Sequence, residues 1–131
     1  MIAIQDDRAK RTVRITMTGF IKLEEMQAAA VQMKGLTDAY EGSPHLCLAD
    51  MRGLKPSSPD VAGAMGEAIA YARQHGVVHC AHLSDSSTVM LQAARLVREV
   101  VPGDPGITNV VSLEEAELVL DEVRRKLPPP R

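Results

Sequence analysis

Two short and almost wholly apolar runs, at residues 45–49 and 76–83, most constrain the fold of this chain. A strand that is apolar on both sides has to be covered on both faces of its sheet, as the strands of parallel sheets are. Each run is followed by a segment whose apolar residues recur with helical spacing. Strands that alternate with helices in this way predict a parallel sheet with helices packed against it.

The residues before the first apolar run predict a hairpin and a helix. Ile2 and Ile4 are two residues apart, as on one face of a strand, and the turn-forming pair Asp6 and Asp7 follows. Apolar and polar residues then alternate over 13–18, which predicts a second strand that is buried on one face. Over 22–40 the spacing becomes helical. The chain therefore opens with two antiparallel strands and one helix.

Helix-start signals mark the remaining elements. Ser58 and Pro59 combine a capping hydroxyl with a proline at the first helical position. Ser112 and Glu115 have the spacing of a capping box. We expect a helix over 58–75, a helix that begins within 84–87 and ends before 102, a strand over 107–111 and a last helix from 112.

These elements predict an α/β fold with a mixed, mostly parallel sheet of about five strands and four helices. The N-terminal hairpin is followed by alternating helix and strand units. A length of 131 residues fits one domain. We expect this domain to cover residues 1–127 and a short proline-rich tail to cover 128–131.

The composition argues against several classes of partner. Aromatic residues make up 2% of the chain and the net charge is −2, so neither stacking platforms nor a basic surface for nucleic acid is expected. No stretch reaches the roughly 20 apolar residues of a membrane span. Two acids precede the first basic residue, unlike a signal peptide, so we expect a cytoplasmic protein. No cofactor-binding or catalytic motif is present, and we expect neither a cofactor nor an enzyme.

The polarity of a parallel sheet places a candidate ligand site at the carboxyl ends of the two apolar strands. Residues 51–58 and 84–87 follow these strands and should meet at one edge, where α/β sheets bind ligands. The candidate ligand-binding residues there are Asp50, Arg52, Gly53, Ser57, Ser58, His82, Ser84 and Asp85.

Each of these candidates has a structural alternative. Asp50 either binds a polar ligand or accepts hydrogen bonds from turn N–H groups, while Arg52 could hold a carboxylate or phosphate with two parallel bonds. Ser58 is favoured as a helix cap, which leaves Ser57 as the freer hydroxyl. His82 is the histidine best placed to face a ligand.

A metal site is disfavoured, because His79 should point to one face of its strand while Cys80 and His82 point to the other. Cys47 and Cys80 lie in the middle of covered strands, where a thiol behaves as a small apolar group.

The helix over 58–75 is the element most suited to cover an apolar cleft. Gly63 and Gly66 weaken it by about 1 kcal/mol each relative to alanine. They either allow close packing against the sheet, which we favour, or let the segment move. The chain also contains seven methionines, whose flexible side chains fill gaps in a core or line a pocket that adapts to an apolar ligand. Plain core packing is the simpler interpretation of the methionines.

Three segments resemble the SpoIIAA-like family of STAS/SEC14 (STAS-like) domains. They are 18–25 (Thr-Gly-Phe-Ile-Lys-Leu-Glu-Glu), 48–54 (Leu-Ala-Asp-Met-Arg-Gly-Leu) and 110–117 (Val-Val-Ser-Leu-Glu-Glu-Ala-Glu). The resemblance implies a small non-enzymatic α/β domain that binds lipid-like or other small apolar ligands, associates with membranes or contacts regulatory proteins. In the related anti-sigma-factor antagonists a phosphorylatable serine opens a helix after the strand that carries the aspartate. Ser57 and Ser58 occupy the comparable place, although 56–59 reads Pro-Ser-Ser-Pro and the antagonists carry Asp-Ser-Ser-Gly.

The leading hypothesis is a non-catalytic STAS-like domain that binds a small apolar or amphipathic ligand, or a protein partner, at the predicted edge. The alternative is a protein-interaction switch regulated by phosphorylation of Ser57 or Ser58. A third hypothesis, a small enzyme that uses His82 with Asp50 or Asp85, is supported by position alone. Peripheral membrane association is compatible with the resemblance. A homodimer through the hairpin or an exposed helix face is also plausible.

Overall fold

The structure is a computed structural model that describes residues 1–103 and 106–129. In chain order its elements are β1 (Ile2–Asp7), β2 (Thr12–Met17), α1 (Leu23–Asp38), β3 (His45–Asp50), α2 (Pro59–Gln74), β4 (Val77–Leu83), α3 (Ser87–Val100), β5 (Ile107–Val110) and α4 (Leu113–Arg125). Residues 104–105 of the connector before β5 and residues 130–131 of the proline-rich tail lie outside the described residues.

The five strands form one mixed sheet in the order β1-β2-β3-β4-β5. β1 is antiparallel to β2, and the pairs β2–β3, β3–β4 and β4–β5 are parallel. The α/β architecture with a hairpin and a mostly parallel sheet, predicted from the order of elements, is therefore confirmed. Among the described residues, no helix is long and apolar enough to cross a membrane.

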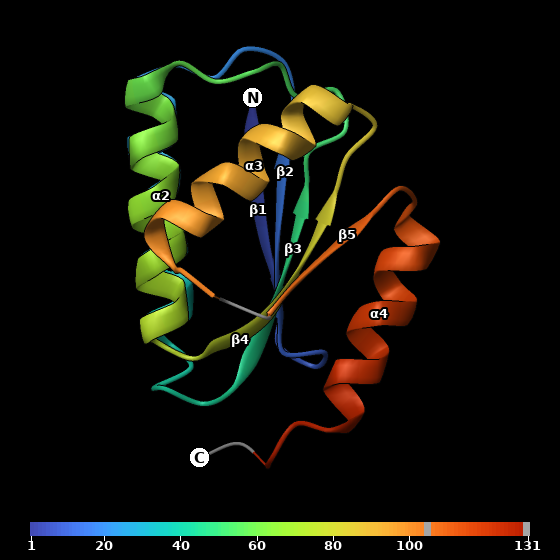
Figure 1. Cartoon of the computed structure of the whole chain (residues 1–131). Coiled ribbons are helices and arrows are strands. Elements are labelled where there is room, and N and C mark those ends of the chain that lie inside the picture. Colours follow the sequence, from blue (N-terminus) through green and yellow to red (C-terminus); the bar gives the residue numbers. More distant parts are fainter. Residues whose placement is uncertain (104–105, 130–131) are drawn as a thin grey trace.

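Helices cover both faces of the sheet, and Figure 1 shows α2 and α3 on one side and α4 on the other. The larger core lies between the sheet and α1, α2 and α3, and it contains Val13 and Ile15 of β2. The smaller core lies under α4 and contains Leu46 and Leu83. Successive residues of a strand point to opposite faces, so β3 and β4 contribute to both cores. This double coverage explains why their sequences are almost continuously apolar.

The opening hairpin differs from the prediction at its turn. Asp6 and Asp7 are the last residues of β1, where they pair with Val13 and Thr12, and the turn lies at 8–11. Aspartate is a frequent turn residue, but a tertiary contact decides its place here. The buried Tyr40 hydroxyl donates a hydrogen bond to Asp6 at 2.6 Å, which keeps Asp6 in the strand.

The predicted helix caps are confirmed at two helices and are wrong in detail at a third. The hydroxyl oxygens of Ser86 and Ser112 accept hydrogen bonds from the third following N–H group at 3.3 and 3.1 Å. Ser58 occupies the position before α2, but its side chain makes no capping bond. Its hydroxyl donates to Asp60, and the Asp60 carboxylate accepts from the N–H of Val61.

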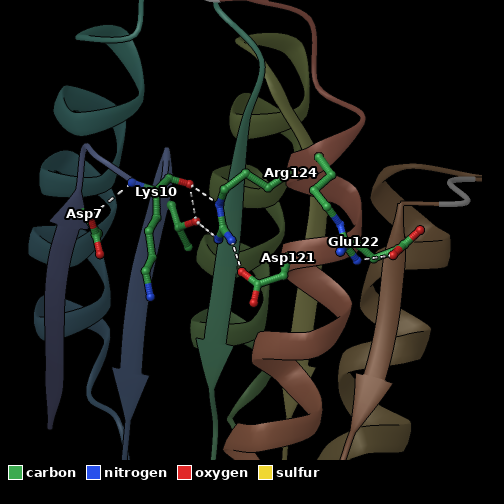
Figure 2. A network of polar contacts seen from close by, with 7 residues as sticks. Asp7, Lys10, Asp121, Glu122 and Arg124 are labelled. Atoms are coloured by element: carbon green, nitrogen blue, oxygen red, sulfur yellow. Dashed lines mark hydrogen bonds and ion pairs between the residues drawn. The ribbon is translucent and has the colours of Figure 1, made fainter.

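Arg124 fastens the end of α4 to the hairpin, as Figure 2 shows. Its Nε donates to the carbonyl oxygen of Lys10 at 2.7 Å, and its Nη2 donates to the Thr12 hydroxyl at 3.0 Å. Its Nη1 pairs with Asp121 on the preceding turn of the helix. α4 packs over β3, β4 and β5, and Arg124 near its C-terminal end contacts the start of β2.

Candidate ligand-binding site

The loops after β3 and β4 meet at one edge of the sheet, which we call the rim (residues 51–58 and 84–87). The N–H of Met51 donates to the carbonyl oxygen of Leu83 at 2.7 Å. The N–H of Gly53 donates to the Asp85 carboxylate at 3.2 Å. The parallel pairing of β3 with β4 thus brings together the two loops that the sequence predicts to be neighbours.

Ser57 and Gln92 close the rim between the β3 loop and α3. The N–H of Ser57 donates to Gln92 Oε1 at 2.9 Å, and Gln92 Nε2 donates to the carbonyl oxygen of Ser57 at 2.8 Å. The backbone of Ser57 is therefore held by a reciprocal pair of bonds. Ser57 is half-buried, whereas Ser58 is exposed at the start of α2.

The single site expected from the sequence is divided between the two faces of the sheet. Asp50 shares the face of Leu46 and Leu48, which is the face covered in part by α4. Ser57 and His82 instead line a cavity on the opposite face. Asp50 and Arg52 therefore lie on the opposite face of the sheet from His82 and Ser57, because adjacent strand residues point away from one another.

An apolar cavity of about 110 Å³ lies between the sheet and the helices α1, α2 and α3. It runs beneath α2 from Leu54 and Ser57 at the rim to Arg73 and Val77 at the other end of the sheet. Five of the seven methionines line it: Met17, Met26, Met33, Met51 and Met65. The methionines thus line a pocket as well as fill the core.

Small side chains explain why the layers leave this space. The alanines that line the cavity come from a strand and two helices: Ala49, Ala62, Ala68, Ala72 and Ala93. Only three aromatic residues occur in the chain, and none of them lines the cavity within the described residues. A core that contains few large side chains and no phenyl, phenol or indole ring at this point leaves room between helix and sheet.

Two cysteines and His82 lie side by side in the lining of the cavity. Cys47 and Cys80 face one another across β3 and β4 and line the cavity with His82, of which 6% is exposed. Contact with the Cys47 thiol and burial raise the pKa of Cys80, so its thiol stays protonated. His79 points to the other face and contacts the Thr108 hydroxyl at 2.8 Å, as strand alternation predicts. Within the described residues, no three His, Cys, Asp or Glu side chains could hold a metal ion together.

Asp50 is the centre of an ion cluster at the end of β3. Arg52 donates to both of its carboxylate oxygens, from Nε at 3.0 Å and from Nη2 at 2.8 Å. Arg14 of β2 donates to the same carboxylate at 3.3 Å. Only 3% of Asp50 is exposed, and burial by itself raises the pKa of a carboxyl group. The bonds from Arg52 outweigh this effect and hold the pKa of Asp50 below its ordinary value. Gly53 adopts a φ of +79°, which favours glycine and turns the chain so that Arg52 reaches back to Asp50.

Ser84 and Asp85 support the rim rather than a cavity. The Ser84 hydroxyl accepts from the N–H of Ser86 at 3.1 Å, and 3% of Ser84 is exposed. Asp85 is exposed and holds the N–H of Gly53. These contacts order the two loops relative to one another.

Sequence reasoning did not identify Arg14, Arg73 or Gln92. Arg73 lines the end of the cavity that lies away from the rim. It donates to the carbonyl oxygens of Val77 and Gly106 at 3.1 and 2.6 Å. Gln92 and Arg14 lie far along the chain from the groups they contact, so local patterns carry no signal for them. The alanine spacing of α2 was the available signal for the cavity, since Ala62, Ala68 and Ala72 share one helix face.

No protein-family model, no curated protein and no solved structure matches this chain.

Proposed function

We propose that the protein is a non-catalytic binding domain of the SpoIIAA-like STAS type that takes the apolar part of a small amphipathic ligand into the cavity beneath α2. The observation that carries this proposal is the cavity itself, which is lined mostly by methionine, alanine and other aliphatic side chains. Enclosed apolar cavities of similar size bind apolar molecules. The protonated thiol of Cys80 is compatible with such a ligand.

The energetic cost of the cavity supports a binding role. An unfilled volume of about 110 Å³ costs at most roughly 2 to 3 kcal/mol relative to a filled core, because the cavity is partly open to solvent. That cost is a large part of the stability of a small domain. Larger side chains at Ala68 or Ala93 would fill the space. A bound apolar group would recover the same contacts.

The size of the cavity defines the class of ligand. A volume of about 110 Å³ is somewhat smaller than a cavity known to hold benzene, so it suits a short apolar chain or one small ring. A longer chain requires α2 to move away from the sheet. The polar side chains of the lining, among them Ser57, Gln92 and Arg73, lie towards its two ends. A polar head group would be placed at one of these ends.

The family part of the proposal is supported by the order of elements and by the place of one motif. The Asp-Met-Arg-Gly segment at 50–53 stands at the end of β3, where the resemblance to SpoIIAA-like domains puts it. In this chain the motif forms the ion cluster of Asp50 and Arg52.

A series of linear alcohols from 1-butanol to 1-octanol tests the binding proposal by isothermal titration calorimetry. Each added methylene that enters the cavity should strengthen binding by about 0.8 kcal/mol until the cavity is full, after which the gain should stop. Binding that does not saturate, or that does not depend on chain length, would contradict the proposal.

A pair of variants shows whether the alcohols bind beneath α2. Ala93→Leu places a larger side chain in the cavity, and Ala28→Leu makes the same change on the exposed surface of α1. We expect Ala93→Leu to weaken 1-hexanol binding at least tenfold and Ala28→Leu to leave it unchanged. Equal affinities for the two variants would exclude the cavity as the binding site.

A second candidate function is a switch that depends on phosphorylation of Ser58. The observation that favours it is the exposed Ser58 hydroxyl, which is not used as a helix cap. A phosphate at this position would interact favourably with the N-terminus of α2, although Asp60 would oppose it. Incubation with ATP and lysate of the native cells, followed by phosphosite mapping, tests this candidate. Absence of phosphate from both Ser57 and Ser58 would eliminate it.

A further inference from the structure

The face of the sheet opposite the cavity carries a pair of arginines that share one carboxylate. Nη2 of Arg14 and Nη2 of Arg52 lie 3.3 and 2.8 Å from the same oxygen, Oδ2 of Asp50. The two guanidinium groups are therefore neighbours, although their residues come from β2 and from the loop after β3. Asp50 is buried, so it fixes both groups from below.

Most of the hydrogen-bonding capacity of these two arginines is unused. Arg52 donates to Asp50 through Nε and Nη2, and Arg14 donates through Nη2 alone. Within residues 1–103 and 106–129, the Nη1 groups of both arginines and Nε of Arg14 make no hydrogen bond to protein atoms. The side chains remain 35% and 43% exposed, so these donors are accessible to a ligand.

The donor groups of the cluster favour an anion. Two guanidinium groups surround the Asp50 carboxylate, and the exposed Asp85 carboxylate also interacts electrostatically with Arg52. Arginine presents planar pairs of N–H donors that match the oxygens of phosphate and carboxylate groups. Because Asp50 already holds both side chains in place, a ligand would not have to order them, and it would lose less entropy on binding.

A polar hollow beside Arg14 gives space for the rest of such a ligand. It has a volume of about 200 Å³ and lies between the hairpin and α4. Lys10, Arg14 and Arg124 line it together with Asp7, Glu117 and Asp121. Figure 2 shows Lys10, Asp7, Asp121 and Arg124 in this region, with Asp121 already paired to Arg124. Side chains of both signs suit a polar, hydroxylated body rather than an apolar chain.

From this arrangement we infer that Arg14 and Arg52 form a binding site for the phosphate or carboxylate group of a small, polar, water-soluble molecule. The site lies on the face of the sheet opposite the apolar cavity, so it is independent of the function proposed for the cavity.

Titration of the ¹⁵N-labelled protein with glycerol 3-phosphate tests the inference without altering the protein. The arginine side-chain N–H signals of Arg14 and Arg52 should shift with one saturable curve at constant ionic strength. The signal of Arg95, an exposed arginine of α3, should not shift. Shifts of similar size in all arginines, or shifts that never saturate, would overturn the inference.

Variants then measure the contribution of each guanidinium group. Arg14→Gln and Arg52→Gln should each weaken glycerol 3-phosphate binding about tenfold, as expected for the loss of one charge-assisted contact. Arg95→Gln is the matched control and should retain the affinity of the original chain. If Arg52→Gln does not fold, Arg14→Gln still tests the site, because Arg14 gives Asp50 a single bond at 3.3 Å. Unchanged affinity in Arg14→Gln would overturn the inference.

A last comparison separates a soluble phosphate from a lipid head group. Sedimentation with vesicles of phosphatidic acid and phosphatidylcholine reports binding of the same phosphate chemistry at a membrane surface. We expect no sedimentation that depends on Arg14. The assignment to a soluble ligand would be overturned if the original chain bound the vesicles but not glycerol 3-phosphate, and if Arg14→Gln abolished the vesicle binding.

Discussion

His45 is the most completely buried titratable side chain that the structure places outside the candidate sites, with 0% exposed. Its ring stacks on Tyr40 with 4.0 Å between the ring centroids. Nδ1 faces the carbonyl oxygen of Ser43 at 2.8 Å, so it carries the proton, and Nε2 accepts from the Thr37 hydroxyl at 3.3 Å. Burial lowers the pKa of His45, against the smaller opposing effect of the Ser43 bond.

This pKa makes the stability of the fold dependent on pH. The unfolded chain takes up a proton near pH 6.5, whereas folded His45 does so at lower pH. The stabilising effect is therefore complete above about pH 6.5 and is lost as the pH falls from there to the folded pKa, by at most about 1.4 kcal/mol per unit. Urea unfolding of the protein and of His45→Gln should show that the variant loses this slope. A His75→Gln control should keep it, and an unchanged slope in His45→Gln would contradict the assignment.

Asp50 gives a second prediction for a single residue. The bonds from Arg52 and Arg14 lower its pKa, so its stabilising effect is present above about pH 3.8 and is lost as the pH falls below that value. Asp50→Asn should lower the free energy of unfolding by about 2 kcal/mol at pH 7, less than for a fully buried pair because the arginines are partly exposed. Thermal unfolding measures this loss. A loss below about 0.5 kcal/mol, typical of surface ion pairs, would show that the cluster is not structural.

The sequence identified Asp50 and Arg52 as candidates but not their face of the sheet. Arg14 lies 36 residues before Asp50, and the pairing of β2 with β3 decides that the two meet. No local pattern records that pairing. Asp6 and Asp7 were wrongly predicted as a turn for the same reason, since the contact from Tyr40 to Asp6 joins distant parts of the chain.

Helix α2 shows what element patterns can and cannot predict. Its start at Pro59 and its end near His75 follow from the proline at the first helical position and from Gly76, and both are confirmed. The sequence also suggested close packing at the two helical glycines. The structure shows it at Gly66 alone, where an added Cβ would lie 2.9 Å from a Val100 methyl group, and the packing partner is α3 instead of the sheet.

This difference predicts opposite outcomes for two matched substitutions. Gly63→Ala meets no atom within 4 Å and should raise the free energy of unfolding by about 1 kcal/mol through helix propensity. Gly66→Ala should gain little or lose stability, because Val100 and Leu96 have to shift. Urea unfolding of the two variants compares them directly. Equal stabilisation would show that α2 and α3 are not in close contact.

At the scale of the whole molecule, sheet polarity was the most predictable feature. The alternation of apolar strands and helices was sufficient to place residues 51–58 and 84–87 at one rim, and the bond from Gly53 to Asp85 confirms their contact. The cavity was less predictable, because its volume depends on how three helices and the sheet pack together. The alanines and methionines that line the cavity can be read from the sequence. That they surround one space depends on the packing of the folded chain.

The methionines provide the most direct measurement of the central claim, that the space beneath α2 binds an apolar group. The protein labelled with [methyl-¹³C]methionine gives one methyl signal for each of its seven methionines. On titration with 1-hexanol, we expect the signals of Met17, Met26, Met33, Met51 and Met65 to shift together to saturation. The signals of Met1 and Met90, which do not line the cavity, should stay in place. Shifts of Met1 and Met90 alone, or no shift of the five cavity methionines, would contradict the account.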